Sequence, residues 1–150
     1  MQSNEEVVLE VIRAVEERDA EALFRLYHDD VELHDAPSIP YRHHAGKMAM
    51  SEQLGTAPEE TWLGTWGPLQ PTEAERRMDP RVVATNDEEV VVQYTTRATA
   101  PNGERFESPV LGLYEVRDGK LARAQMFHYD TAAILEFLER ATESGSAEAT

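Results

Sequence analysis

The strongest constraint on the fold is the run from Arg81 to Tyr129, where apolar and polar side chains alternate over long stretches. Alternation with a period of two is typical of β-strands that bury one face. The turn sequences Pro101-Asn-Gly103 and Arg117-Asp-Gly119 divide the run, and Asn-Gly and Asp-Gly favour tight hairpins. The pattern predicts three long antiparallel strands, over Arg81–Ala98, Phe106–Val116 and Lys120–Tyr129.

Helical patterns stand on both sides of these strands. From Glu5 to Glu17, valine and isoleucine recur at the spacing of an amphipathic helix. Asp19 can cap a second helix that reaches Tyr27, and Asp130 can cap a closing helix. Between the two groups, Gly64–Met78 is consistent with a further strand, interrupted near Pro68 and Pro71 because proline suits an edge or a bulge.

This order of elements predicts an α+β domain. We expect a cone-shaped, curved antiparallel sheet packed against the N-terminal helices, with a C-terminal helix closing the chain. The interior of such a cone is a natural place for a small ligand. Residues 1–143 form the predicted single domain, and residues 144–150 form a small polar tail that we expect to fray.

Composition excludes several classes of function. The chain has no cysteine, so disulfides, thiolate metal sites and a cysteine nucleophile are ruled out. A formal net charge of -15 opposes binding to nucleic acids or anionic membranes, which both need a basic surface. The polar start at Gln2–Glu6 does not look like a signal peptide, and no apolar run approaches the ~20 residues of a membrane span. We therefore expect a cytoplasmic protein.

Asp35 is the first candidate for chemistry. On the short predicted strand that begins at Val31, the period of two places Val31, Leu33 and Asp35 on one face. A carboxylate that continues a core-facing row must be hydrogen-bonded, paired or held for chemistry, because burying it alone is costly. The alternatives are a turn-forming Asp before Ala36-Pro37 and a rim residue that caps backbone amides.

Three segments together resemble a known superfamily. They are Asp29-Asp-Val-Glu-Leu-His-Asp35, Val110-Leu-Gly-Leu-Tyr-Glu-Val-Arg-Asp-Gly-Lys-Leu121, and Phe127-His-Tyr-Asp-Thr131 ahead of a helix. They resemble the cone-shaped superfamily of SnoaL-like polyketide cyclases, ketosteroid isomerase and nuclear transport factor two. The resemblance implies cofactor-independent acid/base chemistry (cyclisation, isomerisation or dehydration) on a small, largely apolar carbonyl compound, in secondary metabolism. Because this fold also hosts proteins that are not enzymes, a non-catalytic ligand-binding or assembly module is the alternative.

The resemblance also separates the known activities of the superfamily. Asp35 stands at the spacing of the general base of ketosteroid isomerases, but the positions of its two oxyanion donors look like Val11 and Leu111. The carboxylate–arginine–carboxylate set of limonene-epoxide hydrolases falls on Gln93, Thr95 and Met126. Without these groups, neither steroid isomerisation nor that epoxide hydrolysis is expected.

His128 and Asp130 are the remaining catalytic candidates. If the last strand runs without a bulge, His128 shares a face with Ala124 and Met126 and can divide base and acid roles with Asp35. Otherwise His128 lies on the outer face. Asp130 is close to an acid/base carboxylate of the polyketide cyclases, but it can equally be a helix N-cap. The last strand has one residue more than in these relatives, which a bulge or a later helix start would absorb.

Aromatic side chains supply the candidate substrate contacts. A tyrosine can orient a carbonyl or hydroxyl group, although only one face of each strand contributes, and a tryptophan can gate the cone mouth or simply fill the core. The predicted substrate-binding residues are Tyr27, Trp62, Trp66, Tyr94, Tyr114, Met126 and Tyr129.

We predict no metal site and no cofactor. His28, His34, His43 and His44 cluster near three aspartates, yet their spacing matches no metal motif. A separate prediction concerns assembly. The helices leave one face of the sheet uncovered, and we expect a homodimer to cover it, because two-fold dimers are the commonest way to do so.

Overall fold

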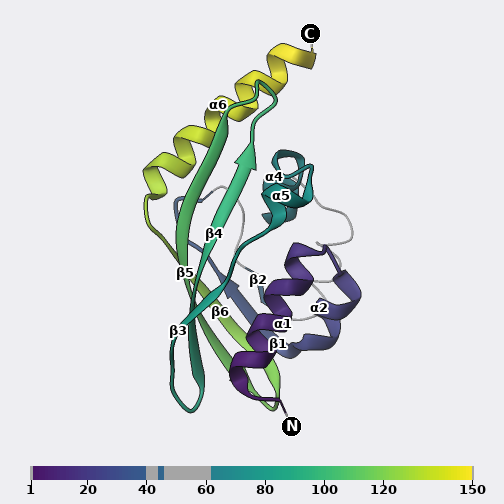
Figure 1. Ribbon diagram of the computed structural model, residues 1–150, viewed down its shortest axis with the longest axis vertical. Coiled ribbons are helices and arrows are strands. Elements are labelled where there is room, and N and C mark those ends of the chain that lie inside the picture. Colours follow the sequence, from purple (N-terminus) through teal and green to yellow (C-terminus); the bar gives the residue numbers. More distant parts are fainter. Residues whose placement is uncertain (1, 40–43, 46–61, 150) are drawn as a thin grey trace.

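The computed structural model describes residues 2–39, 44–45 and 62–149 (Figure 1). Its elements, in chain order, are α1 (Asn4–Glu16), α2 (Ala20–Leu26), β1 (Tyr27–His34), β2 (His44–Ala45), α4 (Trp62–Trp66), the 3-10 helix η1 (Gly67–Leu69), α5 (Glu73–Arg76), β3 (Arg81–Thr85), β4 (Glu89–Thr99), β5 (Arg105–Arg117), β6 (Lys120–His128) and α6 (Thr131–Ala149).

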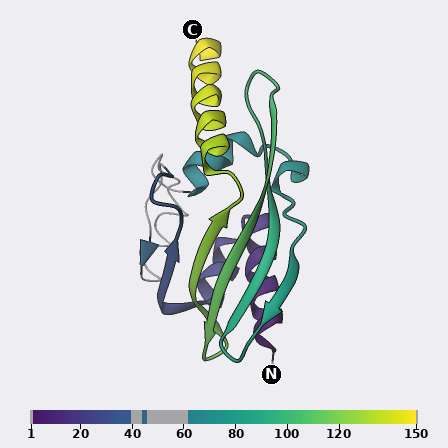
Figure 2. The same ribbon diagram turned by 90° about the vertical axis from the view of Figure 1, so that its left-hand side faces the viewer.

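The strands of the described residues form one six-stranded sheet in the order β2-β1-β6-β5-β4-β3. The meander from β3 to β6 is antiparallel, but the single strand predicted over Arg81–Ala98 is wrong, because a turn between Thr85 and Glu89 divides it into the paired strands β3 and β4. Strand β1 joins β6 in parallel, which the sequence did not indicate. Helices α1 and α2 pack on one face of the curved sheet (Figure 1). Seen from the other side, the sheet lies in front of these helices and is not covered by them (Figure 2). The α+β cone expected from the sequence is confirmed.

Helix α1 begins at a Ser3 cap that the sequence analysis did not single out, and α2 begins at the predicted Asp19 cap. The Ser3 side chain accepts a hydrogen bond from the Glu6 amide, and the Asp19 carboxylate accepts one from the Ala22 amide. Each cap satisfies a backbone donor that the first helical turn leaves open. Helix α2 ends at Leu26, so Tyr27 starts β1 instead of finishing the helix as predicted. That change places the Tyr27 ring inside the cone.

The extra residue of the last strand lies in a β-bulge next to the β5–β6 turn. Val116 pairs with Leu121 and Glu115 with Arg123, so Ala122 is the additional residue of a bulge. The preceding turn is the predicted one, with both Asp118 and Gly119 at positive φ. Because the bulge comes before Ala124, the remainder of β6 runs uninterrupted to His128.

The predicted strand over Gly64–Met78 is wrong. This segment forms α4, η1 and α5 instead. Pro68 stands in the first turn of η1, where its missing N–H costs nothing, and Thr72 and Glu75 form a capping box at α5. The predicted tail also differs, because α6 continues through it to Ala149.

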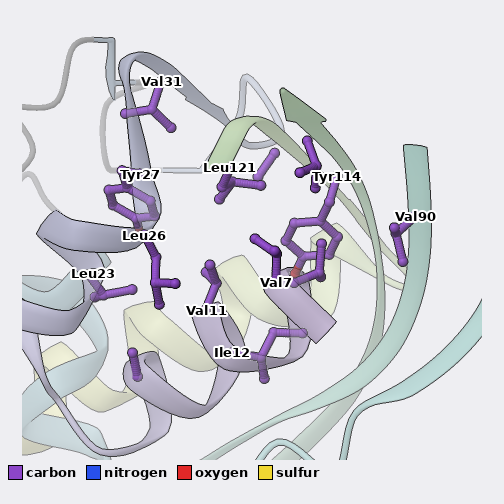
Figure 3. Close-up of a cluster of buried hydrophobic side chains, with 14 of the residues drawn as sticks. Val7, Val11, Ile12, Leu23, Leu26, Tyr27, Val31, Val90, Tyr114 and Leu121 are labelled. Atoms are coloured by element: carbon purple, nitrogen blue, oxygen red, sulfur yellow. The ribbon is translucent and has the colours of Figure 1, made fainter. Parts of the chain in front are cut away.

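Two apolar clusters fill the space between sheet and helices. The first contains Val7, Val8, Val11, Ile12, Ala14, Leu23, Leu26, Tyr27, Val31, Val90, Val92, Tyr114, Val116, Leu121 and Ala124, and Figure 3 shows most of these side chains converging between α1, α2 and the strands. The second contains Ile39, Trp66, Leu69, Ala98, Ala100, Ile134, Phe137, Leu138 and Ala141. Among the described residues, no helix has the length and apolar character needed to cross a membrane.

Candidate functional site

A band of polar side chains crosses the inner face of the sheet between the two apolar clusters. On β4 the inward positions run from Val92 in the first cluster, through Tyr94, to Ala98 in the second. Along neighbouring strands the inward positions also lead from the first cluster toward the second, and a polar side chain lies at the boundary between the clusters. Buried polar side chains in proteins are usually hydrogen-bonded, and one that is not calls for a functional explanation. We call this set the polar band: Asp35, Tyr94, Ser108 and His128.

Asp35 and His128 form a hydrogen-bonded pair in this band. The distance from Asp35 Oδ1 to His128 Nε2 is 2.5 Å, and the two side chains are 12% and 5% exposed. Asp35 directly follows β1 and His128 ends β6. Because β1 and β6 are parallel neighbours, with Leu33 opposite Ala124, their carboxyl ends bring the two side chains together. The structure thus brings His128 and Asp35, which the sequence analysis had both singled out, into direct contact.

The pair defines which nitrogen of His128 is available. Asp35 Oδ1 also accepts the Ala36 amide at 2.8 Å. A carboxylate can only accept hydrogen bonds, so Nε2 of His128 donates and carries the proton. The other ring nitrogen, Nδ1, is buried with no hydrogen-bond partner among the described residues, and it has a free lone pair whenever it carries no proton. An unpaired buried polar atom costs about 1–3 kcal/mol, which makes it a mark of function.

Tyr94, Tyr114 and Met126 lie beside this pair. The Tyr94 hydroxyl donates to Met126 Sδ at 3.1 Å, and the Tyr114 hydroxyl lies 4.0 Å from the same sulfur. Met126 is two residues before His128 on the inner face of β6. The structure therefore brings together five of the predicted site residues: the two tyrosines, Met126 and the Asp35–His128 pair.

Burial changes the acidity of two tyrosines. It raises the pKa of Tyr27 well above the usual tyrosine value, and it does the same for Tyr114, with a smaller contribution from the neighbouring Tyr27. Both hydroxyls stay protonated throughout the neutral range, because the phenolate cannot be solvated in the first apolar cluster. Tyr114 can therefore donate a hydrogen bond at any working pH.

The two tryptophans belong to the second apolar cluster. Trp66 is fully buried and its ring lies 6.4 Å from that of Phe106. Trp62 packs against the same cluster from its edge, with the Arg18 guanidinium 5.0 Å from its ring centre. Burial, with a contribution from Arg76, lowers the pKa of Arg18 to about 10. These contacts give both tryptophans a packing role.

Two predicted residues lie apart from the interior. Tyr129 is 83% exposed, so its ring does not line the cone. The Asp130 carboxylate accepts the Ala133 amide at 3.0 Å and caps α6, which is the alternative that the sequence had left open.

Two inward-facing positions of β5 were not singled out from the sequence. Ser108 is a buried polar residue, and its place in the alternation of β5 was the signal that could have identified it. Gly112 faces the interior where a larger residue would not fit, since a Cβ there would lie 2.5 Å from the Tyr114 ring. A glycine inside a strand often marks such a close approach.

The polar band offers no set of metal ligands. Across residues 2–39, 44–45 and 62–149, no three His, Asp or Glu side chains converge as a metal ion would require. His43, part of the histidine-rich stretch, lies outside the described residues. A surface hollow of about 450 Å³ has a charged lining that includes neither Asp35 nor His128; it is formed by Glu16, Glu17, Glu73, Arg76 and Arg77.

Comparisons with known proteins agree with this architecture. A family model described as a SnoaL-like domain matches residues 8–124. TerC, solved with polyporic acid, has 24% sequence identity and a TM-score of 0.72, covering 91% of this chain and 98% of that one. An NTF2-like protein of unknown function from Burkholderia pseudomallei has 19% identity and a TM-score of 0.69, with 92% and 98% coverage.

A third solved structure is that of an enzyme of polyether ring formation. SalBIII, an epoxide hydrolase/cyclase-like enzyme in pyran ring formation in polyether salinomycin, has 18% identity and a TM-score of 0.59, covering 85% of this chain and 91% of that one. At these identities the likeness is one of fold. Among curated proteins no match was found.

Proposed function

Because the chain belongs to the SnoaL-like domain family, which matches it over residues 8–124, we propose that it is an acid/base enzyme acting on a small, largely apolar carbonyl compound. The reaction is a cyclisation, an isomerisation or a dehydration, and it uses no cofactor. The observation that carries this proposal is the buried Asp35–His128 pair, whose free Nδ1 has no partner among the described residues.

The pair has the parts that a general base requires. Nδ1 of His128 accepts a proton from the substrate, and the Asp35 carboxylate stabilises the imidazolium that results through its 2.5 Å contact with Nε2. The same imidazolium then returns the proton to another atom of the substrate. A positioned base of this kind typically contributes 10²–10⁴-fold to a rate. In this scheme Asp35 orients the base, and His128 is the group that touches the substrate.

The surroundings favour an apolar substrate. The pair lies between two clusters of buried hydrophobic side chains, and Val110 separates His128 from Tyr94 across the strands. A ligand that reaches Nδ1 must therefore pack mainly against carbon. Such sites bind apolar compounds and use a few polar groups to orient them.

The relatives are compatible with a role in secondary metabolism. TerC was co-crystallised with polyporic acid, and SalBIII takes part in pyran ring formation in salinomycin. Ring formation and proton transfer next to a carbonyl both need a base in an apolar interior. A non-catalytic binding module would call for a sealed or wholly apolar interior, and the Asp35–His128 pair makes this interior polar, which supports the enzyme.

A homodimer is part of the same proposal. The open face of the sheet carries Leu111 and Phe127, which are 43% and 51% exposed and lie directly opposite each other on β5 and β6. Exposed apolar side chains in one row are typical of an interface. A second copy of the chain is the partner that a two-fold arrangement would supply.

Hydrogen exchange at carbon tests the proposed function directly. In D2O a base that works next to a carbonyl will replace the α-hydrogens of 2-tetralone, a small apolar ketone, and proton NMR follows the loss of signal. We expect the protein to accelerate this exchange above the buffer rate. A protein that binds the ketone, as seen from broadened ketone signals, but leaves its exchange rate at the buffer value would be a binding module instead.

A further inference from the structure

Met126 Sδ accepts hydrogen bonds from two tyrosines on different strands. Tyr94 on β4 donates to it at 3.1 Å, and Tyr114 on β5 approaches it to 4.0 Å. Both rings are buried on the inner face of the sheet. Two hydroxyl donors are thus directed at one atom in an apolar interior.

The Met126 sulfur is a weak acceptor for the two tyrosine hydroxyls. A thioether sulfur is a weak acceptor, whereas a carbonyl oxygen, and still more an enolate oxygen, is a strong one. A ligand that brings such an oxygen to this point replaces weak hydrogen bonds by strong ones. Donors held in place in a dry site stabilise developing negative charge most effectively, because they need no reorganisation during the reaction.

Gly112 makes this arrangement possible. The Tyr114 ring leans back along β5 over Gly112, so that a Cβ at this position would lie 2.7 Å from the Tyr114 hydroxyl oxygen. Gly112 is also the register partner of Met126 on β6. The missing side chain therefore lets the Tyr114 hydroxyl reach the sulfur.

The donors lie close to the free nitrogen of the base. Met126 and His128 are two residues apart on the same face of β6, which corresponds to about 7 Å along a strand. Tyr94, Val110 and His128 also stand in one row across β4, β5 and β6. A small molecule can thus present an oxygen to the tyrosines and a hydrogen to His128 at the same time.

We infer that Tyr94 and Tyr114 are the donor pair for the carbonyl oxygen of the substrate, and that the substrate is an enolisable ketone whose oxygen displaces Met126 Sδ. This inference rests on the proposed function and names its substrate class. Tyr94 and Tyr114 are then catalytic residues, and Gly112 is a positioning residue that acts through Tyr114.

The step conserves atoms and electrons without a further reactant. Nδ1 of His128 removes a proton from the carbon next to the carbonyl, the C–H pair forms the carbon–carbon double bond, and the carbonyl π pair moves to oxygen. Tyr94 and Tyr114 hydrogen-bond the enolate oxygen. The enolate then takes the proton back at the far carbon of a conjugated double bond where the substrate has one, expels a β-hydroxyl that leaves as water with that proton, or attacks a second carbonyl whose alkoxide receives it.

The test uses 2-tetralone exchange in D2O on single variants. Tyr94→Phe and Tyr114→Phe remove only the hydroxyls, and each is expected to slow exchange of the bound ketone by about 10²-fold, the usual effect of deleting one oxyanion donor. Ketone affinity, measured by NMR titration, should fall by much less than the exchange rate, because the hydroxyls bind the enolate oxygen more strongly than the ketone oxygen. Thr95→Val is the matched control, because it deletes a hydroxyl from the opposite face of β4.

A second variant covers the case in which a tyrosine change disturbs packing. Met126→Leu keeps the volume and removes the competing sulfur, so the ketone should bind more tightly. An unchanged or weaker affinity in Met126→Leu, or exchange at the original rate in both tyrosine variants, would overturn the inference. If exchange needs His128 but neither hydroxyl, the proposed function survives and the inference alone fails. If the unaltered protein does not accelerate exchange above the buffer rate, both the proposed function and the inference are overturned.

Discussion

Asp35 and His128 meet at 2.5 Å although 93 residues separate them in the chain. Their contact depends on two neighbouring strands that run in parallel and end together, so that the carboxylate after β1 reaches the imidazole at the end of β6. The same contact holds the imidazole in the tautomer that leaves Nδ1 free.

The first prediction concerns this pair. His128→Gln removes the base and should lower the exchange rate of 2-tetralone by about 10²-fold or more. Asp35→Asn should give a smaller loss, because the imidazole remains but loses both its orientation and the negative charge beside it. His34→Gln and Asp30→Asn are matched controls from the outer or exposed positions of β1. Equal rates in His128→Gln and His34→Gln would rule His128 out as the base.

The second prediction concerns Gly112. A Cβ at this position would lie 2.5 Å from the buried Tyr114 ring, so Gly112→Ala should lower the free energy of unfolding by about 1–3 kcal/mol through overpacking. Urea unfolding measures the loss. In a Tyr114→Ala background the ring is gone, and adding Gly112→Ala should cost much less. If the two changes are simply additive, the close approach is not the cause.

The third prediction is an alkaline loss of stability. Burial raises the pKa of Tyr27 and of Tyr114 in the folded state, while a tyrosine in the unfolded chain ionises near its ordinary value of about 10. Their contribution to stability is complete below that pH and is lost as the pH rises above it, since only the unfolded chain releases these protons. Urea unfolding across this range should show a shallower decline in Tyr27→Phe and in Tyr114→Phe. Identical slopes in all three proteins would contradict the assignment.

The fourth prediction concerns assembly. Light scattering should give twice the chain mass of 16.9 kDa, and Phe127→Glu should return the protein to that single mass by placing a charge on the open sheet face. Phe24→Glu is the control, because Phe24 is an exposed phenylalanine on helix α2, on the other side of the molecule. A monomer in the unaltered protein, or a dimer that persists in Phe127→Glu, would exclude an interface through this face.

Local sequence patterns predicted much of the fold because they depend on neighbouring residues. The alternation along β4 and β5 and the Asp118-Gly119 turn follow from backbone preferences that operate within a few residues. The same local reasoning failed over Gly64–Met78, where Pro68 was interpreted as a break in a strand although it starts a 3-10 helix. Proline is compatible with both positions, and the packing of Trp66 against Phe106 decides between them.

For the site, the sequence by itself determined that Asp35 continues the face of Val31 and Leu33, because side chains alternate strictly along a strand, and it left the face of His128 dependent on whether the last strand has a bulge. Only the tertiary structure decided that β1 lies parallel to β6 and that Ala122 absorbs the extra residue, which together bring Asp35 onto His128. Register between distant strands is set by the packing of the whole core, and no pattern within either strand encodes it.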